Sequence, residues 1–138
     1  MTASRCAAAA FAAALLGTHG SAIGCEPPPI GTDATRLTGR HFVVDWRVEP
    51  APLRLGEFFT VVVSVCERAG KPVSSLKVDA TMPAHQHGMN YAPTVTSEAA
   101  GRFRANGLLL HMPGLWELRF DLAGGSTRET VRSTVELK

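Results

Sequence analysis

The 138-residue sequence has few cysteines, little net charge and no long apolar run beyond residue 16. Three cysteines are too few for a disulfide-rich scaffold. Basic residues exceed acidic ones by only two and are interspersed with them, without a basic stripe. We therefore expect no nucleic-acid partner. No segment after the first 24 residues is long enough to span a bilayer, so no transmembrane helix is expected in the mature chain.

The motifs of the common catalytic classes are missing as well. HExxH, CxxC and phosphate-cradling glycine loops are absent, and the serines have no nucleophile elbow. The spacing of His85, His87 and His111 is similar to that of the three-His zinc site of α-class carbonic anhydrases, but the chain is far too short for that fold. A blue-copper centre would need a cysteine ligand beside the histidines. We predict that the protein is not an enzyme.

The first 24 residues have the pattern of a secretory signal peptide. Arg5 supplies the positive charge, residues 6–16 are an apolar run of mostly Ala and Leu, and residues 17–24 are small and polar. Cleavage is expected before Cys25. The pattern predicts export to the periplasm.

Cleavage leaves two cysteines, Cys25 and Cys66, for which two mutually exclusive interpretations exist. Cys25 could head a lipobox over residues 22–25 and carry a lipid anchor, or it could form a disulfide with Cys66 in an oxidising compartment. The lipobox is imperfect, because Leu is usual where Ala22 stands. A polar stretch over residues 18–21 also separates the apolar run from the cysteine. Both features favour the disulfide.

The mature chain divides into an irregular, Pro-rich leader over residues 25–39 and one domain over residues 40–138. The domain consists of short β-type runs separated by Pro and Gly, and the alternation is clearest from Trp116 to Leu122. The seven predicted strands cover residues 41–49, 57–66, 76–82, 94–98, 102–111, 116–122 and 131–137. This pattern predicts an all-β fold, a single antiparallel immunoglobulin-like β-sandwich.

Histidine and methionine gather in two segments. Residues 82–91 read MPAHQHGMNY and residues 111–114 read HMPG. They hold three of the four histidines and all three methionines that follow residue 24. Thioethers suit Cu(I) and imidazoles suit both copper oxidation states, so the segments predict a copper site. Met82 continues the apolar alternation of the strand before it and is expected in the core.

The spacing of these residues predicts how they meet. In an extended segment, residues two apart point to the same side, so His85, His87 and Met89 are expected to converge. His111 ends a predicted strand just before a turn and therefore lies at an end of the sandwich, where a neighbouring loop can bring the first cluster. Met112 fits a ligand and a core residue equally well. Trp116 is expected to pack in the core, or to flank the site.

The two motifs, together with Gly101 ahead of the Phe103 strand, resemble the YtkA-like domains of bacterial exported proteins over residues 58–122. The resemblance implies an immunoglobulin-like sandwich with the architecture of CopC-type periplasmic copper carriers and of accessory proteins of cytochrome oxidase assembly. The ligands that it implies are His85, His87, Met89 and His111, with Met112 less firmly.

The expected function is copper binding or carriage in the periplasm, for oxidase assembly or copper resistance. The alternative is a non-metal accessory module that docks a membrane or cytochrome partner. In that case the His/Met motifs serve the fold.

Overall fold

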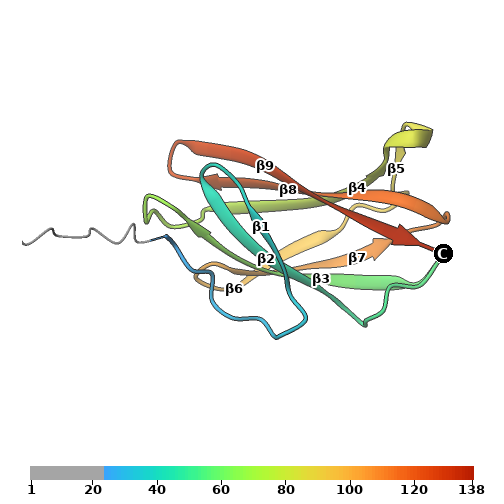
Figure 1. The fold of residues 1–138 in the computed structure, drawn as a ribbon, viewed down its shortest axis with the longest axis horizontal. Coiled ribbons are helices and arrows are strands. Elements are labelled where there is room, and N and C mark those ends of the chain that lie inside the picture. Colours follow the sequence, from blue (N-terminus) through green and yellow to red (C-terminus); the bar gives the residue numbers. More distant parts are fainter. Residues whose placement is uncertain (1–23) are drawn as a thin grey trace, which may run out of the picture.

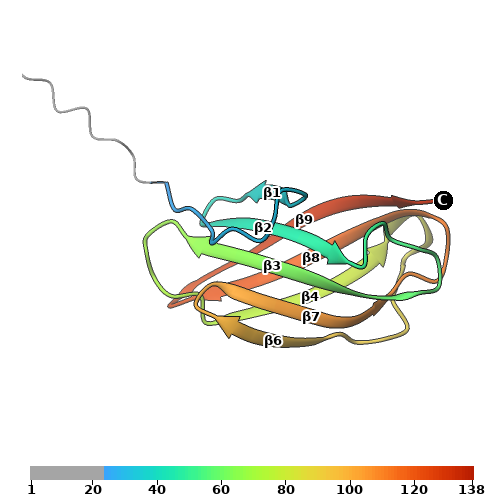
Figure 2. The same ribbon diagram turned by 90° about the horizontal axis from the view of Figure 1, so that it is seen from below.

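The computed structural model describes residues 24–138, which form a sandwich of two antiparallel sheets (Figures 1 and 2). The all-β antiparallel sandwich expected from the sequence is confirmed. The predicted signal peptide, apart from Gly24, lies outside the described residues. The first sheet has the order β1 (Thr35–Thr38), β2 (Phe42–Glu49), β3 (Phe58–Glu67), β7 (Arg102–Leu109) and β6 (Thr94–Ala99). The second has the order β5 (His87–Gly88), β4 (Ser75–Met82), β8 (Gly114–Gly124) and β9 (Thr127–Leu137).

Each of the seven predicted runs is a strand, and two further short strands are present. Residues 35–38, expected to be irregular, form β1 against β2, with Arg36 opposite Asp45. The Arg36 guanidinium donates two hydrogen bonds of 2.7 Å to the Asp45 carboxylate, which holds this polar strand at the sheet edge. The second addition, β5, has only two residues. In the described part of the chain no helix is long and apolar enough to cross a bilayer.

The core lies between the sheets and is built from the alternating apolar positions. Trp116, Leu118 and Phe120 of β8 are fully buried on one face of their strand. The ring of Phe120 lies 5.9 Å from that of Trp46 on β2, so aromatic side chains join the two layers. Burial of these side chains is the main favourable term in folding.

The Gly124-Gly125 pair marks a hairpin, as predicted. β8 and β9 pair from Gly114 with Leu137 to Gly124 with Thr127, which leaves a two-residue loop. Gly125 has φ +57°, the left-handed conformation that such loops demand and that glycine adopts most easily.

The leader lies on the outer face of the first sheet. A disulfide joins Cys25 to Cys66 at the end of β3, with 5.8 Å between the two Cα atoms. Arg102 donates a 2.5 Å hydrogen bond to the carbonyl of Pro29. The disulfide occupies the Cys25 sulfur, so of the two interpretations of this cysteine the structure contains the disulfide and not a free thiol open to lipid attachment.

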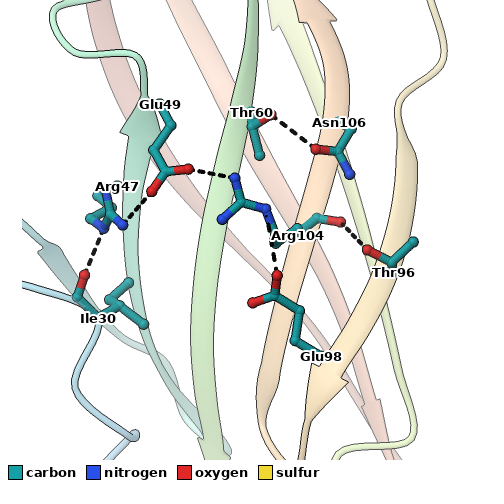
Figure 3. A network of polar contacts seen from close by, with 8 residues as sticks. All are labelled: Ile30, Arg47, Glu49, Thr60, Thr96, Glu98, Arg104 and Asn106. Atoms are coloured by element: carbon teal, nitrogen blue, oxygen red, sulfur yellow. Dashed lines mark hydrogen bonds and ion pairs between the residues drawn. The ribbon is translucent and has the colours of Figure 1, made fainter.

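A polar network continues this attachment along the outer face of the first sheet (Figure 3). Arg47 donates to the carbonyl of Ile30 at 2.6 Å and also bonds Glu49. Glu49 accepts a second hydrogen bond from Arg104, which lies 3.5 Å from Glu98. The Arg104 hydrogen bond, helped by Arg47 and opposed by burial, lowers the pKa of Glu49. The network links the leader to β2, β7 and β6.

A second polar contact joins the two sheets. The Glu129 carboxylate on β9 accepts hydrogen bonds from the backbone N–H groups of Arg40, His41 and Phe42, at 2.6, 2.9 and 3.0 Å. Burial alone would raise the pKa of Glu129, but these three donors outweigh it and hold the pKa below its usual range. A Cβ at Gly39 would lie 2.6 Å from this carboxylate, so a side chain at this position would displace the carboxylate from its three donors.

Candidate metal site

The two His/Met segments meet at the end of the sandwich that is remote from the disulfide. β4 ends at Met82, and β5 pairs back onto it with His87 opposite Met82. The intervening 3₁₀ turn η1 (Pro83–His85) and the left-handed Gln86, at φ +54°, reverse the chain between these strands. Figure 1 shows η1 and β5 at the end where the C-terminus also lies. The expectation that His85 and His87 share one extended segment is therefore wrong, because Pro83 starts a turn.

The reversal still brings the three histidine rings together. The ring centres of His85 and His87 are 5.9 Å apart, and those of His87 and His111 are 5.2 Å apart. Two imidazoles bound to one tetrahedral ion have ring centres about 5 Å apart, because the metal–nitrogen bond is about 2 Å long. The spacing of neighbouring rings therefore fits a shared ion.

Two ring nitrogens have informative surroundings. His87 Nδ1 lies 3.1 Å from the carbonyl of Gly88, so a proton on Nδ1 leaves Nε2 as the metal-binding nitrogen. His111 Nδ1 is buried and has no hydrogen-bond partner among residues 24–138. An unpaired buried polar atom costs about 1–3 kcal/mol, and an imidazole nitrogen that binds a metal no longer needs a hydrogen bond.

The donors do not yet converge on one point. Within the described residues, no three His, Cys, Asp or Glu side chains form a group that could hold an ion as they stand. The rings of His87 and His111 are stacked, with 29° between their planes. Rotation of side chains is needed to close the site, and His85, exposed on η1, is free to rotate.

The methionines lie at the inner side of this cluster. Met82 is buried in the core, as its alternation predicted. Met89 and Met112 are half-buried and pack against the same core. Core packing alone accounts for the positions of all three, so a ligand role for Met89 and Met112 stays a prediction.

The sequence did not decide whether Trp116 only packs in the core or also flanks the site. Trp116 is fully buried, and its ring centre lies 5.8 Å from that of His87 and 5.5 Å from that of His111. The indole Nε1 donates a 2.9 Å hydrogen bond to the carbonyl of Met112. Alternation along β8 correctly predicted burial, but it says nothing about which loops lie next to the ring.

Apolar side chains surround the same end. In the part of the chain that the structure describes, the exposed large hydrophobic residues are Leu55, Phe58, Tyr91 and Leu115. The rings of Phe58 and Tyr91 are in contact, 5.2 Å apart. Leu115 lines an apolar pocket of about 260 Å³ together with Trp116. A cluster of exposed apolar groups at one end of a protein is typical of a contact surface.

Comparisons with known proteins support the fold and leave the family open. The chain is similar to a DUF4785 family protein from Legionella pneumophila, with a TM-score of 0.53 and 11% sequence identity. The match covers 70% of this chain and 28% of that protein, so the chain spans less than a third of its length. At this identity the likeness concerns the fold alone. No family model and no curated protein matches the chain, and the YtkA-like resemblance stays a prediction.

Proposed function

We propose that this protein binds and carries copper in the periplasm through His85, His87 and His111, with the thioethers of Met89 and Met112 at the inner edge of the site. The observation that carries the proposal concerns His111, whose buried Nδ1 has no hydrogen-bond partner within the described residues 24–138. Its ring lies beside that of His87, at 5.2 Å between ring centres. Oxidase assembly and copper resistance are the processes that such a carrier would serve.

The choice of copper depends on the donor set. Imidazoles and thioethers gather at this end, and thioethers favour Cu(I) over harder ions. Magnesium and calcium prefer carboxylate and carbonyl oxygens, and the His/Met segments 82–91 and 111–114 contain no carboxylate. The disulfide is consistent with an extracytoplasmic location, where copper carriers meet their metal.

Calorimetric titration with Cu(II), and with Cu(I) kept reduced by ascorbate rather than by a thiol, tests the proposal. We expect the mature domain to bind about one copper ion and the double variant His85→Ala/His87→Ala to bind none, with an unchanged circular dichroism spectrum. His41→Ala is the matched control, because its backbone N–H, which donates to Glu129, is retained. Full binding by the double variant would refute the site assignment, and no binding by the wild type would refute the function.

The exposed apolar residues favour a second candidate, a module that docks a membrane or cytochrome partner without metal. Phe58 and Tyr91 lie in contact on the surface at the histidine end. In this case the copper titration is blank for the wild type. Flotation with phosphatidylethanolamine/phosphatidylglycerol vesicles then tests whether the partner is a membrane. Flotation of the wild type that is lost in Phe58→Ser/Tyr91→Ser would support membrane docking.

A further inference from the structure

The rings of His87, His111 and Trp116 form a nearly equilateral triangle. Its sides, measured between ring centres, are 5.2, 5.5 and 5.8 Å. The point equidistant from the three centres lies about 3.2 Å from each of them. An imidazole nitrogen holds an ion at nearly this distance from its ring centre, because the metal–nitrogen bond of about 2 Å adds to the roughly 1.1 Å from nitrogen to ring centre, so rotation that turns the nitrogens of His87 and His111 toward this point would let them share an ion there. For an indole it is well within the roughly 6 Å range of a cation–π contact.

We infer that Trp116 belongs to the metal site, where its indole ring lies against the ion held by His87 and His111 and makes the site selective for Cu(I) over Cu(II). The inference rests on the proposed copper-binding function and names the oxidation state of its cargo.

The orientation of the rings agrees with this role. Each imidazole plane makes an angle of 74° with the indole plane. A metal ion bound by an imidazole lies in the plane of that ring, so these inclined planes allow an ion over the indole once the stacked rings of His87 and His111, 29° apart, have turned their nitrogens toward it. The hydrogen bond from Trp116 Nε1 to the Met112 carbonyl fixes the indole relative to the residue that follows His111.

Burial of the indole gives the selectivity its physical basis. Trp116 has no exposed surface, so it closes one side of the site with an apolar wall. Cu(II) prefers a tetragonal set of nitrogen and oxygen ligands, which include water, and the wall leaves no room for them on that side. Cu(I) is soft and accepts few ligands, and the π-system adds an attraction that needs no further donor atom.

Tryptophan fluorescence tests this directly, since the chain has two tryptophans. In the variant Trp46→Phe, Trp116 is the single remaining fluorophore. Titration with Cu(I) under ascorbate, and with Ag(I) as a redox-inert substitute, should quench its emission by more than half and produce a new near-ultraviolet absorption band at one equivalent. One equivalent of bound ion with unchanged emission and absorption would overturn the inference, while no bound ion would refute the proposed function instead.

The second measurement compares affinities for the two oxidation states. Trp116→Leu keeps an apolar side chain in the core and removes the π-system, so we expect its Cu(I) affinity to fall about 2- to 30-fold, the range that a cation–π contact of about 0.5–2 kcal/mol provides. Its Cu(II) affinity should change by less than threefold. Trp46→Phe is the matched control and should alter neither. Equal loss of both affinities would show that Trp116 only supports the fold. If Trp116→Leu does not fold, the fluorescence titration of Trp46→Phe decides alone.

Discussion

The two ends of the sandwich differ in their contacts, although buried side-chain atoms without a hydrogen-bond partner among residues 24–138 also occur elsewhere, on Trp46, Ser64 and Arg119. At one end, which we call the disulfide end, the Cys25–Cys66 bond and the Glu129 carboxylate fasten the leader and the first sheet, and the Glu129 carboxylate accepts three hydrogen bonds. At the other, the histidine end, His111 Nδ1 is buried without a hydrogen-bond partner in residues 24–138, and large apolar side chains are exposed. Cys66 lies eight positions after Phe58 along β3, about 26 Å of strand.

This difference indicates where stability and chemistry are placed in the molecule. Unsatisfied polar atoms and exposed apolar groups both lower stability, and they are tolerated where a ligand or a partner completes them. If the proposed function holds, the disulfide end provides stability that offsets the cost of the unpaired nitrogen and the exposed apolar groups at the histidine end. Substitutions at the disulfide end should therefore change stability without changing metal binding, and substitutions at the histidine end should do the reverse.

The largest effect is expected from the disulfide. The bond closes a loop of 41 residues, and loss of such a loop constraint in Cys66→Ala should reduce the free energy of unfolding by about 4 kcal/mol. Denaturant unfolding measures this, and intact mass, two hydrogens lower in the wild type than in its reduced form, confirms the bond. Copper affinity at the far end should be unchanged. A variant of wild-type stability would mean that the leader needs no covalent bond.

Glu129→Gln should have a smaller effect that depends on pH. The amide is a weaker acceptor for the three backbone N–H groups, so we expect a loss of about 1–2 kcal/mol at pH 7. The folded-state pKa of Glu129 lies below its ordinary value of 4.5, so the stabilisation is present above about pH 4.5 and disappears as the pH falls through the folded-state value. Unfolding curves of wild type and variant should therefore differ more at pH 7 than at pH 3. A difference in unfolding free energy that is the same at both pH values would mean that the substitution acts through the shape of the side chain and not through its charge.

The smallest effect, and one of opposite sign, is expected at the histidine end. Replacing His111 with Phe in the metal-free protein removes a buried, unpaired nitrogen while it keeps an aromatic ring. We expect the free energy of unfolding to rise by about 0–1 kcal/mol, because the desolvation penalty of Nδ1 disappears. Thermal melting without metal measures the change. A loss of more than about 2 kcal/mol would show that His111 contributes to the fold in a way that its contacts do not explain.

The long strands could be predicted from the sequence, whereas the short strands and the leader could not. Alternation identified β8 and its buried face, because a half-buried strand must repeat every two residues. It could not identify β1 or β5. β1 is a polar edge strand held by Arg36, and β5 has two residues. The leader showed no pattern either, since Arg102 and Arg47 bind its backbone carbonyls and not its side chains.

For the candidate site, the sequence predicted the residues but not their arrangement. The concentration of histidine and methionine was visible as composition, and the position of His111 after a strand placed it at an end. The reversal at Pro83 and Gln86 depends on a left-handed residue other than glycine, which sequence patterns do not reveal. The neighbourhood of Trp116 depends on which connections meet at that end, and only the packed fold determines this.

Copper-dependent melting of the wild type and of His111→Ala tests most directly whether the histidine end is a metal site built from two connections. An ion that joins the β4–β5 segment to the β7–β8 connection binds the folded chain alone. A hundredfold excess over Kd then stabilises the protein by about 2.7 kcal/mol, a rise in Tm of roughly 10 °C. We predict this rise in the wild type and its near-complete loss in His111→Ala, with His41→Ala unaffected. A His111→Ala protein that keeps both its copper and the full rise would contradict a site that spans the two connections.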